Sequence, residues 1–195
     1  MTSSYMIELG MFIAKILRHD PESIGIMVDE HGWAKVSELI DGVIASGYDH
    51  FNLDQLKELV KTDNKQRYSF NEDYTLIRAN QGHSIKVDVE LYKLTEKDIN
   101  EIGVLYHGTT SRNVKSINKR GLLKMGRNFV QLSNNQQTAE TVGNRHNRKL
   151  PGTLVIYVID IKKLFDDGYD IYRSINGVYL IDHVPSKYFI KIIEY

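Results

Sequence analysis

The spacing of apolar residues changes halfway along the chain, and this change limits the fold more than any other feature of the sequence. In the first 62 residues, apolar side chains recur three or four positions apart, which indicates amphipathic helices. In the second half they form short extended runs, of which Thr153–Ile159 is the most apolar and β-branched. We therefore expect an α+β chain, with a helical part followed by a mainly β part.

The first half is predicted to contain three helices and a hairpin. Pro21 ends the first helix, because the residue before a proline avoids helical geometry. Ser37 and Asn52 are candidate N-caps for the second and third helices, Glu38–Ser46 and Leu53–Lys61. Two more segments are predicted to be extended and to pair around a polar turn, Arg67–Phe70 and Thr75–Ala79. Three helices followed by a two-stranded wing indicate a winged-helix lobe. A further short run, Glu22–Asp29, is predicted to be strand-like.

The second half is predicted to alternate strands with short helices. Val104–Thr110 is a strand that runs into a Gly-Thr turn, and Asn176-Gly177 is the strongest hairpin signal in the chain. A helix over Val114–Arg120 would end at Gly121, and another is expected over Gln136–Val142.

The net charge of zero hides an uneven distribution of charge. Residues 1–95 carry 10 Lys and Arg against 15 Asp and Glu, whereas residues 96–195 carry 15 against 10. Within residues 112–149 there are nine basic residues and one acid, Glu140. Such a cluster fits a polyanionic ligand, although charge alone fits a solvated basic face equally well.

Several classes of protein are disfavoured by what the sequence lacks. It has no cysteine, and its seven histidines form no close pair at metal-ligand spacing, so we expect no metal site. It has no Gly-x-Gly-x-x-Gly, Walker or Gly-x-Ser-x-Gly motif, which argues against a Rossmann, P-loop or α/β-hydrolase site. It has neither a secretory signal nor an apolar run long enough to span a membrane, and we expect a cytoplasmic location.

Four cationic residues stand out by position. Arg18 and His19 lie on the last turn of the first helix, Arg67 begins a strand, and Arg127 lies just before one. Arginine presents a planar fork of donors that matches phosphate oxygens, so several such residues together could bind a phosphomonoester. Taken singly, each is better explained as a surface charge, and Arg18 and His19 as charges that complement the negative end of the helix.

A second candidate is His107-Gly108-Thr109 at the end of a predicted strand. A histidine there can hydrogen-bond a ribose hydroxyl, and a glycine permits close approach of a ligand to the backbone. The alternative is a turn with a buried histidine.

The order of these blocks closely resembles the RNA 2′-phosphotransferase family (KptA type) over nearly the whole chain. The most specific blocks are Leu17-Arg18-His19, Ala79-Asn80-Gln81-Gly82-His83 and His107-Gly108-Thr109, in this order.

The resemblance implies a winged-helix RNA-binding lobe over residues 1–93 and an ADP-ribosyltransferase-like NAD-binding lobe over residues 94–195. It implies that an internal RNA 2′-phosphate, such as a tRNA splice junction carries, is transferred to NAD+ as co-substrate. The products would be RNA with a 2′-OH, ADP-ribose 1″,2″-cyclic phosphate and nicotinamide. The family's catalytic group maps onto Arg18, His19, Arg67 and Arg127, and all four match. The NAD+ site maps onto His107, Gly108, Thr109, Gln131 and Ser133. We expect a monomer whose partners are 2′-phosphorylated RNA and NAD+.

One departure bears on the NAD+ site. The family commonly has a histidine where this chain has Gln131, so NAD+ binding is expected to be weakened or altered. Two other functions therefore stay open: ADP-ribosylation of RNA or DNA terminal phosphates, and RNA binding without catalysis by a protein with a decayed NAD+ site.

Overall fold

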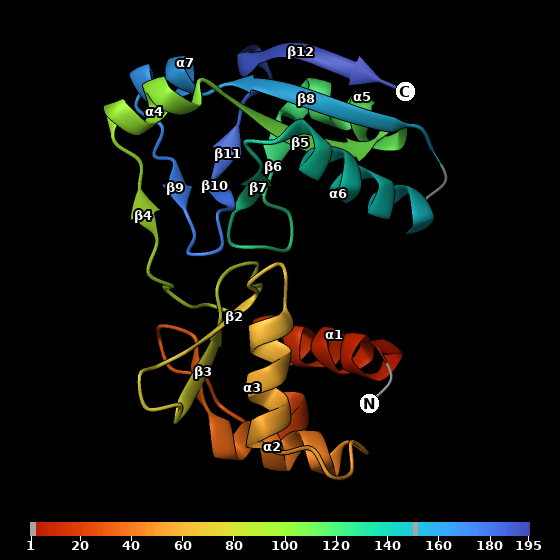
Figure 1. Cartoon of the computed structure of the whole chain (residues 1–195). Coiled ribbons are helices and arrows are strands. Elements are labelled where there is room, and N and C mark those ends of the chain that lie inside the picture. The colour runs from red at the N-terminus through yellow and green to blue at the C-terminus, as the bar shows by residue number, and fades with distance from the viewer. Residues whose placement is uncertain (1–2, 150–151) are drawn as a thin grey trace. The chain divides into compact units, whose positions relative to one another are not determined.

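The computed structural model describes residues 3–149 and 152–195 and is a mixture of helices and small antiparallel sheets (Figure 1). It divides into two compact units, one up to Glu90 and the other from Leu91. The predicted α+β class is confirmed. The predicted lobe boundary, at 93, lies three residues beyond this division. None of the helices in the described ranges is long and apolar enough to cross a membrane.

The N-terminal unit packs three helices on a three-stranded sheet. Its elements are α1 (Ser3–His19), the 3-10 helix η1 (Pro21–Ile24), β1 (Trp33–Lys35), α2 (Val36–Ala45), α3 (Leu53–Thr62), β2 (Tyr68–Phe70) and β3 (Leu76–Ala79). The sheet order is β1-β3-β2, with both pairs antiparallel. The predicted end of α1 and the hairpin are thereby confirmed. The core of this unit includes Leu9, Ile13, Leu39 and Ile77, all fully buried.

Two local predictions for this unit are wrong. Glu22–Asp29 is not a strand: Gly25 takes a left-handed conformation, and its N–H bonds to the carbonyl of Glu22 at 3.0 Å, which closes η1. Ser37 does not cap α2, because β1 leads directly into the helix and the helix begins at Val36. By contrast Asn52 does cap α3, and its side chain accepts from the N–H of Gln55 at 3.1 Å.

The C-terminal unit contains three small sheets. Its helices are α4 (Glu96–Ile102), α5 (Ser111–Arg120), α6 (Gln136–Lys149), α7 (Ile161–Asp166) and the 3-10 helix η2 (Ser186–Tyr188). Its strands are β4 (Tyr92–Lys93), β5 (Val104–Thr110), β6 (Leu122–Leu123), β7 (Val130–Leu132), β8 (Leu154–Asp160), β9 (Tyr172–Arg173), β10 (Tyr179–Ile181), β11 (His183–Val184) and β12 (Phe189–Glu194). Their orders are β4-β9-β10-β7, β11-β6 and β12-β8-β5, and every pair is antiparallel.

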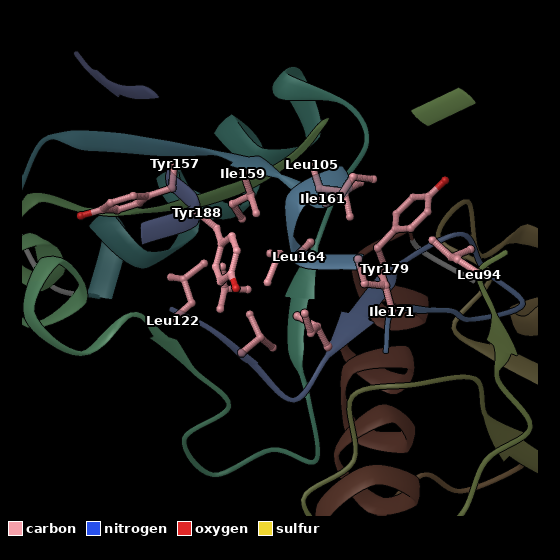
Figure 2. Packing of buried hydrophobic residues seen from close by; sticks show 14 of the residues in the cluster. Leu94, Leu105, Leu122, Tyr157, Ile159, Ile161, Leu164, Ile171, Tyr179 and Tyr188 are labelled. Atoms are coloured by element: carbon pink, nitrogen blue, oxygen red, sulfur yellow. The ribbon is translucent and has the colours of Figure 1, made fainter. Parts of the chain in front are cut away.

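The apolar run of β8 is explained by burial on both faces of its sheet. Val155, Tyr157 and Ile159 point into the main core of the unit, where Tyr157 and Ile159 lie close to Leu105 and Tyr188 (Figure 2). Leu154 and Ile156 point to the opposite face and pack with Ala139 of α6. A strand of this kind has no solvated face that would select polar residues.

A short bridge connects two of these sheets. Tyr106 of β5 and Ser133, which follows β7, exchange backbone hydrogen bonds of 2.7 and 2.9 Å. This bridge brings the middle of β5, with His107, beside the end of β7. The predicted hairpin at Asn176-Gly177 is confirmed as the connection between β9 and β10. The helix predicted over Gln136–Val142 extends further, to Lys149.

Candidate active site

Arg18 and His19 form the last turn of α1, as predicted. Ile16 and Leu17 before them are buried and fix the rotation of the helix. In consequence the Arg18 side chain is half-buried, with its Nε and Nη2 atoms shielded from solvent, while His19 is exposed. The helix thus presents a guanidinium and an imidazole at one end, where its dipole favours positive charge.

The end of α1 is tied to the segment that follows β3. The N–H of Ser84 donates to the carbonyl of Arg18 at 3.0 Å. The Ser84 hydroxyl also lies 2.9 Å from Nδ1 of His19, at hydrogen-bonding distance. Ser84 therefore contacts the backbone of one predicted catalytic residue and the ring of the other.

Arg67 lies just before β2 and is fixed by two neighbours. Its guanidinium forms a short ion pair with the buried carboxylate of Asp63, which also accepts the backbone N–H of Arg67 at 2.6 Å. The carbonyl of Arg67 accepts from the N–H of Asn80 at 2.8 Å. Both the backbone and the side chain of Arg67 are therefore anchored.

Two buried titratable side chains lie within the field of these cations. Burial raises the pKa of Tyr68 to about 12, while the positive charges of Arg18 and Arg67 both act in the opposite direction. Burial, together with the positive charges of Arg18, His19 and Arg78, lowers the pKa of His83 to about 4. The charge of Arg18 therefore acts on both Tyr68 and His83.

A hydrogen bond within the C-terminal unit fixes the tautomer of His107. Its Nδ1 atom lies 3.1 Å from the backbone carbonyl of Gln131, which can only accept. Nδ1 must therefore carry the proton, and in the neutral ring Nε2 is an acceptor. An acceptor at this position suits a ligand hydroxyl.

Arg127 is joined to the same strand through a side chain. It is exposed in the loop before β7, and its Nη1 donates a short hydrogen bond to Oε1 of Gln131. Gln131 thus contacts Arg127 through its side chain and His107 through its backbone.

Gly108 is required for the packing of a helix on β5. A Cβ atom at this position would lie 1.8 Å from the carbonyl oxygen of Ala139, so α6 packs directly on the backbone of β5. Gly143 of α6 is restricted less severely, since its Cβ would lie 2.4 Å from the side-chain atom Leu154 Cδ1 and 3.0 Å from the carbonyl oxygen of Thr109. The group that comes close to the backbone of Gly108 in this structure is therefore the helix α6.

Thr109 and Ser133 both take part in local hydrogen bonds. Thr109 is buried, and its Oγ1 accepts from Asn113 Nδ2 at 3.0 Å. The Ser133 hydroxyl accepts from the N–H of Asn135 at 3.1 Å, just before α6. Ser133 lies beside His107 because of the bridge to Tyr106.

The predicted residues fall into one group in each unit. Arg18, His19 and Arg67 belong to the N-terminal group, and Arg127, Gln131, His107 and Ser133 to the C-terminal group. Throughout the two described ranges, no set of three or more His, Asp and Glu side chains is arranged to hold a metal ion.

A comparison with known families gives this arrangement a context. The profile of the family described as "RNA 2′-phosphotransferase, Tpt1 / KptA family" matches residues 4–183. The chain belongs to this family.

Individual relatives of known name match over almost their full length. A protein from Acaryochloris marina named "Probable RNA 2′-phosphotransferase" is 46% identical over 185 residues, which cover 94% of this chain and 96% of the relative. Proteins of the same name from Fusobacterium nucleatum and Trichormus variabilis are 43% and 41% identical, over 93% and 96% of this chain and 96% and 97% of theirs. The resemblance to the RNA 2′-phosphotransferases is thereby confirmed, and with it membership of a family of transferases.

Sequence reasoning about this chain missed the residues that hold the predicted site together. Asp63, Asn80 and Ser84 are polar residues in or near turns, where such residues are common and carry no functional signal by themselves. Asn80 does lie inside the Ala79–His83 block. The block alone, however, gave no indication of its hydrogen bonds to residues far away in the sequence.

Proposed function

We propose that this protein removes a 2′-phosphate from RNA by transferring it to NAD+. The RNA would carry the phosphate at an internal position, as at a tRNA splice junction. The observation that carries the proposal is that Arg18, His19 and Arg67 are all anchored on one short segment, residues 80–84, in a chain of this family.

The N-terminal group has the chemistry needed to bind a phosphomonoester. Guanidinium groups donate pairs of hydrogen bonds to phosphate oxygens and keep their charge at all physiological pH values. As negative charge shifts between phosphorus and its oxygens during transfer, fixed cations stabilise it without reorganisation. His19, which is exposed and hydrogen-bonded through Nδ1, is proposed as a proton-transfer group. Arg127 of the C-terminal unit is proposed as the fourth catalytic residue.

The C-terminal group has polar atoms suited to NAD+. His107 would accept a hydroxyl of the ribose at Nε2, and Thr109, Gln131 and Ser133 offer groups that both donate and accept. NAD+ would supply the ribose carbon that accepts the phosphate, with nicotinamide leaving. Gln131 in place of the usual family histidine would lower the affinity for NAD+ while keeping a hydrogen-bonding side chain.

The architecture also supports the assignment of RNA binding to one unit and of NAD+ binding to the other. Three helices with the β1-β3-β2 sheet are the elements of a winged helix, and we propose that this unit binds RNA. The antiparallel strands, with His107 in the middle of β5, support an ADP-ribosyltransferase-like unit that binds NAD+.

The decisive experiment uses a synthetic RNA with a single internal 2′-phosphate. The full-length protein is incubated with this RNA and NAD+, and the RNA and nucleotide products are identified by mass spectrometry. We expect RNA with a 2′-OH, free nicotinamide and ADP-ribose 1″,2″-cyclic phosphate, none of which should form without NAD+. An RNA that has lost no phosphate, with no nicotinamide released, would refute the proposal.

Two control reactions separate the other functions. RNA and DNA with terminal phosphates test for a stable ADP-ribosylated product. If that product accumulates while the internal 2′-phosphate persists, the protein is an ADP-ribosyltransferase of nucleic acid ends. If RNA binds but NAD+ does not, the protein binds RNA without catalysis.

A further inference from the structure

The segment Asn80–Ser84, which we call the strap, connects two distant parts of the N-terminal unit. Asn80, the first residue of the strap, forms three hydrogen bonds with residues just before and within β2. Its N–H donates to the carbonyl of Arg67 at 2.8 Å, its Nδ2 donates to the carbonyl of Gln66 at 2.7 Å, and its Oδ1 accepts from Ser69 Oγ at 2.8 Å. Asn80 is 4% exposed, so these bonds are shielded from water.

At its last residue the strap meets the end of α1. The backbone of Ser84 bonds to the carbonyl of Arg18, and its hydroxyl bonds to the ring of His19. The contact between Ser84 and His19 joins residues 65 positions apart in the sequence. The residues that precede β2 and those that end α1 are thus held by opposite ends of the same five-residue segment.

The middle of the strap is built to be rigid. Gln81 and His83 are 9% and 2% exposed, and Gly82 between them has a φ of 90°, a conformation that favours glycine. A segment that is buried in its middle and hydrogen-bonded at both ends keeps a fixed length.

We propose that Asn80 and Ser84 are positioning residues that set the distance and orientation between Arg67 and the Arg18–His19 pair. This inference rests on the proposed function, since the three cations must meet one phosphate for their spacing to matter. Asn80 holds Arg67 in place through its hydrogen bonds to the carbonyls of Gln66 and Arg67 and to the side chain of Ser69. Ser84 holds the end of α1 through the carbonyl of Arg18 and the ring of His19. Catalysis by fixed charges is sensitive to displacements of about 1 Å, which is the scale that loss of such anchors permits.

The test compares two strap variants with two matched controls. Asn80→Ala and Ser84→Ala remove the side-chain hydrogen bonds that Asn80 and Ser84 make with Gln66, Ser69 and His19. Asn71→Ala removes an asparagine with two hydrogen bonds at the other end of the β2–β3 hairpin, to Leu76 N–H and to Thr75 Oγ1. Ser46→Ala removes a serine hydroxyl that donates to the carbonyl of Gly42 at the end of α2. Each control therefore loses a comparable interaction in the same unit without touching Arg18, His19 or Arg67.

We expect both strap variants to lower the rate of 2′-phosphate removal at saturating RNA and NAD+ by about tenfold or more. Both controls should stay within about twofold of wild type at a similar loss of thermal stability, and Ser84→Thr, which keeps the hydroxyl, should recover most of the rate. If the strap variants that remain folded keep the wild-type rate, or if the controls lose as much, the inference is wrong. Ser84 is exposed, so its variant remains informative even if Asn80→Ala fails to fold.

A second readout does not depend on catalysis. In NMR spectra of the full-length protein with labelled histidine, Ser84→Ala should change the ring nitrogen shifts and titration of His19, whereas Ser46→Ala should not. An unchanged His19 signal in Ser84→Ala would overturn the role of Ser84. An inactive wild-type enzyme would refute the proposed function instead, so the two failures can be told apart.

Discussion

Arg127 donates a hydrogen bond from Nη1 to the side-chain Oε1 of Gln131, while the backbone carbonyl of Gln131 accepts from His107. A single residue of β7 therefore contacts both a predicted catalytic arginine and a predicted NAD+ ligand. Its side chain and its backbone do so independently, which makes the two functions separable by mutation.

Gln131→Ala should weaken the positioning of Arg127 and leave His107 in place. The substitution removes the acceptor of a hydrogen bond from a charged group but keeps the backbone carbonyl. We expect the rate of phosphate removal to fall about tenfold through the loss of the bond to Arg127. The KM for NAD+ should rise by more than about threefold, because the same side chain is a proposed NAD+ ligand. Steady-state kinetics with NAD+ varied at saturating RNA measure both quantities. An unchanged rate would show that the bond to Arg127 is not needed, and an unchanged KM would remove the Gln131 side chain from the NAD+ site.

Gln131→His should improve the use of NAD+. An imidazole has fewer rotatable bonds than a glutamine side chain, so less conformational entropy is lost when it orders around a ligand. We expect the KM for NAD+ to fall by about fivefold, with no comparable change in the KM for RNA. A rise in the KM for NAD+ would show that glutamine is the better residue in this chain.

Arg127→Ala should abolish activity and spare the fold. Arg127 is exposed, so its removal creates no cavity, whereas loss of a charge that stabilises phosphoryl transfer is expected to slow the reaction by about 10²-fold or more. Arg120→Ala, at the exposed end of α5, is the matched control. Thermal unfolding and activity are measured on the same samples. A fall in melting temperature as large as that of a core mutant would indicate a structural role for Arg127.

Gly108→Ala should destabilise the C-terminal unit severely. Its new methyl group would overlap the carbonyl oxygen of Ala139, a backbone atom that cannot rotate away. We expect a loss of about 3 kcal/mol or more in the free energy of unfolding. Gly126→Ala is the control, because no atom lies within 4 Å of the position that its Cβ would take. Similar unfolding curves for the two variants would contradict the close packing of α6 on β5.

His83 should make the stability of the protein depend on pH in the acid range. Its pKa is lowered from 6.5 to about 4 in the folded protein, so the unfolded state binds a proton more readily. The stability that this histidine contributes is therefore complete above pH 6.5 and is lost as the pH falls toward 4. The shift corresponds to about 3 kcal/mol at most. Urea unfolding at pH 7.0 and 4.5 should show a smaller loss of stability for His83→Gln than for wild type. An equal loss in both proteins would place the pKa of His83 near its ordinary value.

The parts of the fold that local chemistry determines were predictable. Pro21 sets the end of α1, Asn52 caps α3, and Asn176-Gly177 makes a turn, because each depends on residues within a few positions. The error over Glu22–Asp29 has the same origin, since one left-handed glycine outweighed a run of apolar residues with strand propensity.

The connections between predicted site residues could not be predicted in this way. Nothing in the sequence near His19 indicates that its ring will bond to Ser84. In the same way, nothing near Arg67 indicates that its carbonyl will accept a hydrogen bond from Asn80. Such contacts depend on how β3 and the strap pack against α1, which is a property of the tertiary fold. The four cations could be identified from the family's sequence blocks. The residues that hold them in place, such as Asp63, Asn80 and Ser84, could be identified only from the structure.

The bond between His107 and Gln131 limits what position 131 must supply. Every amino acid has a backbone carbonyl, so any residue at position 131 that preserves β7 can hold the His107 ring in the same tautomer. The side chain at this position is therefore not needed to orient His107. A substitution there can change the contact with Arg127 and leave the ring of His107 as it is.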